Sequence, residues 1–535
     1  MKFLEKTLSV FFFVMFILSC AKIGRPDGGP KDELAPIMVS ANPPYESVNF
    51  NKKTIKLNFN EFIRLKNLNK QLVVSPPLKN PALISPQGTP SKFLEIKILD
   101  TLLQNTTYTF NFGNAIQDNN ESNELENFKY VFSTGTYIDS LFFSGNTKNA
   151  FEQEKVKNVN IILHKIDSFY SDSTIYKQKP IYVSTTLDSS NFKFSNLKKG
   201  AYFVFALKEE NSDYLFNSKS DEIAFLLDTI QLPQDSILLK SLELFKEIPE
   251  YKFKRAKELT KGHIVFGYEG TGDEIELNLL SEVPENFQSV SKFEQDKDTL
   301  NYWFSEVETD SLNFEVKHPN FIDTITVRLR KKKNDSLLVN SINKGVLHPR
   351  DTFFLETNNP IVAIDTSKIS IVSKDSSNVF FRSYVSLKDN RIALIFDKKY
   401  LENYSFSIFP NALVDVFSQA NDTLNYTVKT KELEDYGQIT MNISNNTNHQ
   451  LIVELIDEKQ RLIDRRFIDQ QKTLTFSELE PKKYIVRAII DANKNNQWDT
   501  GNFLQKQLPE RVIYFPTTID VRPNYFMNET FEITY

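Results

Sequence analysis

The stretch Thr54-Ile-Lys-Leu-Asn-Phe-Asn60 alternates polar and apolar side chains at every position. Successive side chains of a β-strand point to opposite faces, so this alternation predicts a strand with one buried face. The pattern recurs at residues 94–98, 108–112 and 128–132, between turns rich in Asn, Asp and Gly. Short strands at this spacing predict a β-sandwich over residues 36–136.

The alternation continues through the rest of the chain. It returns at residues 159–163, 202–205, 263–266, 275–279 and 325–329. A single core stops growing at about 250–300 residues, so several domains are expected. We predict an all-β fold of tandem β-sandwich domains that cover residues 36–136, 137–246, 247–340, 341–432 and 433–535.

Two segments of the second half repeat segments of the first half. The matching stretches are Phe476-Ser-Glu-Leu479 with Phe194-Ser-Asn-Leu197, Tyr484 with Tyr202, residues 404–408 with 108–112, and residues 411–415 with 114–118. The first two matches share one constant offset. Repeats of this kind predict that residues 433–535 duplicate 137–246 and that residues 341–432 duplicate 36–136.

Two families resemble these segments. Leu57-Asn-Phe-Asn-Glu-Phe-Ile63, Thr107-Tyr-Thr-Phe110, Asn114-Ala-Ile-Gln-Asp118 and Phe132-Ser-Thr-Gly135, in this order, resemble the bacterial Ig-like domain of S-layer proteins and envelope lipoproteins. Residues 194–204 resemble the prealbumin-like sandwich known as the carboxypeptidase-regulatory-like domain, an accessory module without peptidase chemistry. The resemblances imply supporting modules. Residues 247–340 resemble neither family.

The N-terminal 20 residues indicate where the chain is delivered. Lys2 and Lys6 precede an apolar run over residues 8–18, which ends in Ile17-Leu18-Ser19-Cys20. A charged start, a short apolar run and a small residue before cysteine are typical of a lipoprotein signal peptide. The run is shorter than the roughly 20 residues that span a bilayer. We therefore predict that residues 1–19 are removed and that Cys20 carries diacylglycerol and palmitate.

Residues 20–35 are predicted to be a tether. Gly24, Pro26, Gly28, Gly29 and Pro30 make this segment unsuited to packing. In the Gram-negative lipoproteins that this terminus resembles, an Asp after the lipidated cysteine favours the inner membrane. Ala21 stands there instead, which indicates anchorage in the outer membrane. The periplasmic side and the cell surface are both alternatives for the side that the protein faces.

Composition excludes several kinds of site. Cys20 is the only cysteine, so an intramolecular disulfide and a cysteine-based zinc cluster are impossible. A formal net charge of −5 provides no field that would recruit nucleic acid. The expected partners are the membrane, through the lipid anchor, and an unidentified envelope protein or glycan.

One polar loop has the ligand spacing of a calcium site. Its candidate ligands are the side chains of Asp491, Asn493, Asn495 and Asp499 and the backbone carbonyl of Gln497. Asn496 replaces the usual glycine and Asn502 replaces the usual bidentate glutamate, so the affinity is expected to be weak. A turn closed by its own side-chain hydrogen bonds is the alternative interpretation, and no other cofactor is indicated.

No residue is predicted to be catalytic. The chain lacks the G-x-S-x-G and H-E-x-x-H motifs and a thiol nucleophile in its folded part, and its five histidines are dispersed. We interpret it as a non-enzymatic scaffold of the cell envelope. One alternative is the glycan- or peptide-binding component of an outer-membrane uptake system. It would require Tyr214, Phe216 and Trp498 to be exposed, whereas a core position is expected for them. The other is an unrecognised hydrolase with two converging carboxylates.

Overall fold

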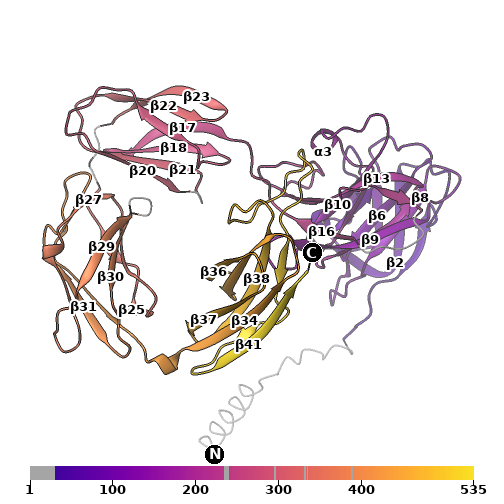
Figure 1. Ribbon diagram of the computed structural model, residues 1–535. Coiled ribbons are helices and arrows are strands. Elements are labelled where there is room, and N and C mark those ends of the chain that lie inside the picture. The colour runs from indigo at the N-terminus through magenta and orange to yellow at the C-terminus, as the bar shows by residue number, and fades with distance from the viewer. Residues whose placement is uncertain are drawn as a thin grey trace, which may run out of the picture.

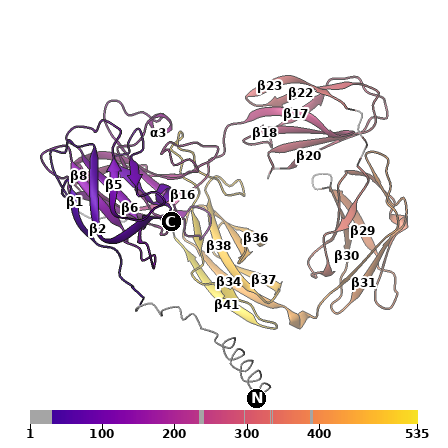
Figure 2. The same cartoon turned by 180° about the vertical axis from the view of Figure 1, so that it is seen from behind.

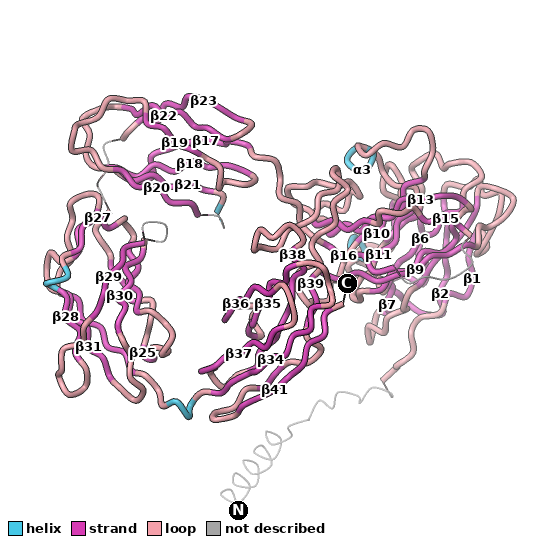
Figure 3. The backbone as a smooth tube through the Cα atoms, in the orientation of Figure 1, coloured by secondary structure: helices cyan, strands magenta, loops and turns pink. Residues whose placement is uncertain are grey.

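The computed structural model describes residues 31–535 except 234–239, 295–296, 331–332, 334, 387–389 and 535. Strands form nearly all of the regular structure (Figure 3). The helices among the described residues are single turns, such as α2 (Leu68–Gln71) and α3 (Thr174–Lys177), and none is long and apolar enough to cross a bilayer. The prediction of an all-β chain of tandem sandwiches is confirmed.

The first unit (residues 38–133) contains the strand that the sequence marks most clearly. In β2 (Thr54–Leu65), Ile55, Leu57 and Phe59 are buried, while Lys56 and Asn60 are exposed. The strands of its first sheet lie in the order β1 (Met38–Asn42), β2, β5 (Ser91–Lys97), β4 (Leu83–Ser85), and β7 (Ile116–Asp118) also pairs with β2. The strands of its second sheet lie in the order β3 (Val73–Ser75), β6 (Thr107–Gly113), β8 (Phe128–Ser133).

The second unit (residues 141–244) and the fifth unit (residues 437–533) share one topology, in which the first and last strands pair in parallel. The sheets of the second unit are β11 (Tyr182–Thr185), β10 (Asn160–Lys165), β13 (Gly200–Lys208), β14 (Glu222–Phe225) with β15 (Ile230–Leu232) on β13, and β12 (Asn191–Leu197), β9 (Leu141–Asn149), β16 (Lys240–Leu244). Those of the fifth unit are β36 (Leu462–Ile468), β35 (Gln450–Asp457), β38 (Lys483–Asp491), β39 (Val512–Tyr514) with β40 (Ile519–Asp520) on β38, and β37 (Lys472–Leu479), β34 (Gly437–Asn445), β41 (Phe526–Ile533).

The third unit (residues 252–328) and the fourth unit (residues 339–429) are also layered. The sheets of the third unit are β17 (Lys252–Thr260), β18 (His263–Glu269), β21 (Thr299–Phe304), β20 (Ser289–Glu294), and β19 (Glu276–Leu279), β22 (Ser311–His318), β23 (Phe321–Arg328). Those of the fourth unit are β24 (Val339–Ser341), β26 (Phe353–Thr357), β30 (Arg391–Phe396), β29 (Phe381–Ser386); β25 (Gly345–Val346), β33 (Leu424–Lys429), β31 (Asn403–Ile408), β28 (Ile369–Val372); and β27 (Ile361–Ile364), β32 (Leu413–Asp415).

The repeated residues make equivalent hydrogen bonds. Tyr108 and Tyr404 each accept a bond at the hydroxyl from the backbone N–H five residues earlier, at 2.9 and 2.8 Å. Tyr202 and Tyr484 each donate from the hydroxyl to the carbonyl four residues earlier, at 2.7 and 2.9 Å. A phenol that ties a strand to the preceding loop fixes the corner of a sandwich. The repeats in the sequence thus correspond to repeated corners in the fold.

The second to fifth units follow one another around a ring, in which the fifth unit returns to the second, and the first unit lies beside the second (Figures 1 and 2). Phe417 of the fourth unit packs so closely on Gly262 of the third that an added Cβ would lie 2.4 Å from Phe417 Cε1. Between the fourth and fifth units, His348 Nε2 lies 2.6 Å from the carbonyl oxygen of Glu478. A separate apolar cluster joins the second and fifth units, so the ring is closed by packing.

Candidate functional site

The predicted calcium loop begins where β38 ends, at Asp491. The Asp491 side chain is fully buried. Its Oδ1 accepts the Asn495 N–H at 3.2 Å, and its Oδ2 accepts the Asn496 N–H at 3.0 Å and the Gln450 side-chain amide at 3.1 Å. Asn496 has φ +66°, a left-handed conformation that asparagine tolerates better than most residues. Asp491 therefore holds the loop closed from inside.

The Asp499 carboxylate accepts hydrogen bonds from two of the other predicted ligands. The side-chain amide of Asn493 donates to Asp499 Oδ2 at 2.5 Å, and that of Asn495 donates to Oδ1 at 3.0 Å. Gln497 is exposed and donates its N–H to Asn495 Oδ1 at 3.0 Å. The structure brings Asp491, Asn493, Asn495 and Asp499 together in one loop, as predicted, and places Gln497 on its rim.

The arrangement satisfies the loop with its own hydrogen bonds, as the turn interpretation requires. The two asparagines present amide nitrogens to Asp499, and nitrogen donors repel a cation. Both side chains would have to rotate to present oxygen. The described residues contain no group of three or more His, Cys, Asp or Glu side chains placed to hold a metal ion. A calcium site here stays a prediction.

Calcium binding has a measurable signature at this loop. Because Asn493 and Asn495 must exchange their bonds to Asp499 for metal contacts, we expect a dissociation constant of about 1 mM or weaker. At about 10 mM calcium, the thermal transition of the fifth unit should rise by a few degrees. The Asp499→Asn variant should lose this shift. Calorimetry without heat or shift in the unaltered protein would remove the calcium interpretation.

The equivalent loop of the second unit is also closed by a carboxylate. Glu209 Oε2 accepts the N–H groups of Asp213 and Tyr214 at 2.9 and 3.0 Å, and Oε1 accepts the Asn160 amide at 3.1 Å. Burial raises the pKa of Glu209 to about 7. Because each oxygen of Glu209 already holds part of the loop, its role is to shape the turn.

The loop of the fifth unit continues to Phe503, an aromatic residue that packs on the second unit and that sequence reasoning missed. Phe503 is 2% exposed, and its ring centre lies 5.3 Å from those of both Phe205 and Phe225 in the second unit. Its N–H donates to the buried Glu247 carboxylate at 2.6 Å. Nothing in the local sequence around Phe503 distinguishes it from a core residue of its own unit.

Phe151 of the second unit in turn packs on the fifth unit. Its ring centre lies 4.7 Å from that of Trp498 and 4.0 Å from the Arg487 guanidinium carbon. The Tyr514 hydroxyl donates to the Phe151 carbonyl oxygen at 2.7 Å. Each of the two related units therefore covers part of the other's outer sheet face.

The three aromatic residues considered for ligand capture lie within this junction. Phe216 is 3% exposed, and Tyr214 and Trp498 are half-buried against the same cluster. They pack between units and do not form the exposed platform that the uptake alternative requires at this place.

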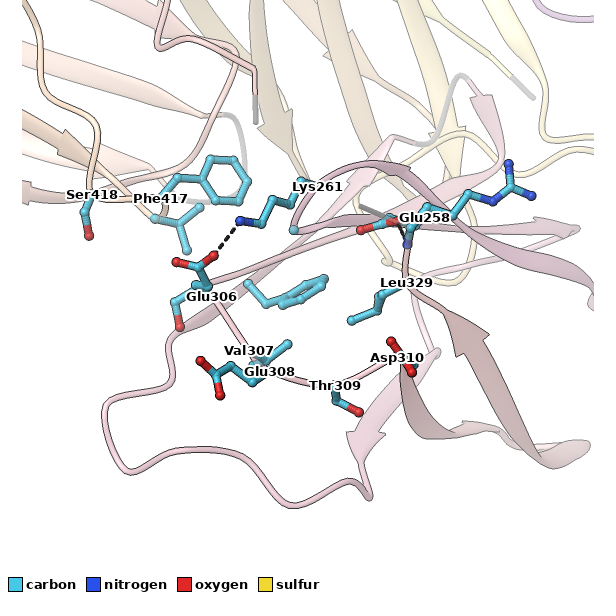
Figure 4. A pocket seen from close by; sticks show the side chains of 15 residues that line it. Glu258, Lys261, Glu306, Val307, Glu308, Thr309, Asp310, Leu329, Phe417 and Ser418 are labelled. Carbon is cyan, nitrogen blue, oxygen red and sulfur yellow. Dashed lines mark hydrogen bonds and ion pairs between the residues drawn. The ribbon is translucent and has the colours of Figure 1, made fainter. Parts of the chain in front are cut away.

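A cavity of about 800 Å³ lies between the third and fourth units (Figure 4). Lys261 forms an ion pair with Glu306 at 2.5 Å, and this contact lowers the pKa of the Glu306 carboxyl. On the opposite wall, Glu258 accepts the backbone N–H of Arg330. A general acid needs a raised pKa, so the Lys261 contact makes Glu306 unsuited to the role that the hydrolase alternative would give it.

Cys20 lies outside the described residues. Residues 32–134 match the model of the bacterial Ig-like domain family, so the predicted resemblance of the first unit is confirmed. No curated protein matches the chain. The resemblance of the second and fifth units to prealbumin-like sandwiches stays a prediction.

Domains 1–6 of the surface layer protein SbsC align at 12% identity over 91% of this chain and 67% of that one, with a TM-score of 0.16. The major pilin subunit of Bacillus cereus aligns at 9% identity over 73% of this chain and 99% of that one, with a TM-score of 0.14. At such scores the alignments do not relate the arrangement of the units.

Proposed function

We propose that this chain is a lipoprotein of the cell envelope, anchored in the outer membrane through Cys20, and that it acts as a non-enzymatic scaffold. The observation that carries the proposal is the order of its parts. A signal of the lipoprotein type ends at Cys20, and a bacterial Ig-like domain begins about a dozen residues later. Four further β units follow and close into a ring.

Ring closure supports a mechanical role. Tandem domains joined only by linkers move freely by default, because interfaces between domains are small. Here the second and fifth units share a buried apolar cluster. The chain therefore presents its surfaces in one arrangement, which suits a protein that holds partners in place. An envelope protein or a glycan is the proposed partner.

Replacing Cys20 with alanine tests the anchor. The Cys20→Ala protein should appear folded in the soluble fraction and should take up no labelled palmitate, because its only lipidation site is gone. Membrane fractionation, palmitate labelling and circular dichroism measure the three properties. Ser19→Ala keeps a small residue before the cysteine and should stay membrane-bound. A Cys20→Ala protein that is unfolded or still firmly bound would contradict the proposal.

Crosslinking in intact cells separates the scaffold from the uptake alternative. A scaffold should be recovered with cell-wall or assembly components in reproducible ratios. Reproducible recovery with a transporter would favour the uptake alternative instead.

A further inference from the structure

A cleft of about 720 Å³ lies between the second and fifth units, beside the loop of residues 491–499. On one side it is lined by the β14–β15 connection and by β16. On the other side it is lined by residues 507–511 together with Asn493 and Asp499. Its volume falls within the range of about 300–1,000 Å³ that ligand sites occupy, and such sites often lie between domains.

The cleft has an aliphatic wall that remains open to solvent. Leu227 of the second unit is 54% exposed and Leu508 of the fifth is 44% exposed, and both line it. Phe225 and Ile490 also line the cleft and are buried. A ligand that covered the two leucines would remove apolar surface from water, which favours binding.

The same cleft carries an excess of negative charge. Asp228, Asp499 and Glu510 line it, and within the described part of the chain none of them forms an ion pair with Lys or Arg. Glu510 instead accepts the N–H groups of Ala492 and Asp499, at 2.8 and 3.2 Å. Arg511 is the one basic residue among the described residues of the lining. A cation placed in the cleft would meet carboxylates that no cation yet neutralises.

We propose that this cleft binds an extended peptide segment that carries lysine or arginine beside a leucine-sized aliphatic side chain. Both halves of that chemistry are needed. A metal ion would leave Leu227 and Leu508 uncovered, and a purely apolar ligand would leave the carboxylates without a counter-charge.

A peptide in this position touches both units at once. It therefore favours the closed ring, because binding stabilises the conformation that presents the complete site. Such a peptide would belong to a partner of the scaffold, and only this biological role rests on the proposed function. The cleft itself requires no lipid, so failure of the Cys20 prediction and failure of this one are separate results.

Binding is tested on the full mature chain, purified in a nonionic detergent. The probe is an acetylated, amidated pentapeptide of alternating leucine and lysine. Two controls replace every lysine with glutamate or every leucine with serine. Calorimetry and tryptophan fluorescence provide the readouts, since Trp498 donates its indole N–H to the Glu510 carbonyl oxygen at 2.8 Å. We expect a dissociation constant of about 1 mM or tighter for the probe and no saturation with either control.

Variants locate the site. Leu508→Ser should weaken binding of the probe about tenfold, and Asp228→Asn about threefold. Leu504→Ser is the matched control, because Leu504 is 61% exposed on the same loop but does not line the cleft. It should bind the probe as the unaltered protein does.

The peptide-binding measurements can support or overturn the proposal. Selective binding that Leu508→Ser weakens and Leu504→Ser leaves unchanged supports the proposal. No heat and no fluorescence change with the probe at about 5 mM overturns it, as do equal binding of the three peptides and equal effects of the two leucine variants.

Discussion

Replacing Glu454 with alanine should lower the free energy of unfolding of the fifth unit by about 3–5 kcal/mol. Glu454 is fully buried on the outer face of its sheet, where Arg487 Nε donates to Oε2 at 2.7 Å and Arg465 Nε donates to Oε1 at 2.8 Å. Arg487 is only 5% exposed, so removal of the carboxylate leaves a buried guanidinium without a counter-charge and with only the Tyr514 hydroxyl as a hydrogen-bond partner on Nη1. Hydrogen exchange of the β35 and β38 amides measures the loss.

The second unit provides the matched control. Glu454 pairs with Arg487 across β35 and β38, and the equivalent pair across β10 and β13 is Ile162 with Phe205. The double variant Glu454→Ile, Arg487→Phe copies that apolar pair. It should recover most of the stability, because a well-packed apolar pair often replaces a buried ion pair without loss. If Glu454→Ala alone proved neutral, the buried ion pair would not be what stabilises this face.

Replacing Phe503 with alanine should open the ring. Removal of a buried phenylalanine costs about 3–5 kcal/mol, and here the cost falls on the contact between the second and fifth units. The contacts that remain include the packing of Phe151 on Trp498 and Arg487 and the ion pair between Lys506 and Asp172, whose side chains are nearly half exposed. Such pairs contribute about 0–1 kcal/mol. Small-angle scattering should show a larger radius of gyration, and the β14 amides should exchange faster.

Leu504→Ala controls for this variant, because it shortens an exposed side chain next to Phe503 and should leave the ring closed. Phe503 belongs to a connecting loop, so the fifth unit's own core should be unaffected. Unchanged scattering for Phe503→Ala would show that the packing of Phe151 is enough to close the ring and would contradict the role given to Phe503.

The strands and their buried faces could be predicted from the sequence. The positions of Ile55, Leu57 and Phe59 followed from the two-residue period of a strand, which is a local property. The duplication of the segments around Tyr108 and Tyr404 was predicted from residue types that recur in order, whereas the corners that these hydroxyls fix were seen only in the structure. The meeting of Asp491, Asn493, Asn495 and Asp499 in one loop could be predicted, because spacing identifies the side chains that a loop brings together. Spacing does not show which atoms they present, and calcium binding stays a prediction.

What covers each outer sheet face was decided by tertiary structure alone. The period of a strand shows that Ile162 and Phe205 share a face, and equally that Glu454 and Arg487 do, but it contains no information about the segment that packs on that face. Phe503 packs on the face of Ile162 and Phe205. Its N–H donates a hydrogen bond to Glu247, which lies 256 residues away in the sequence. Local preference determines strands and turns along the chain. Contact over such a separation depends on how the units stack, and this determined the ring, the cleft and the cover that Phe151 places over Arg487.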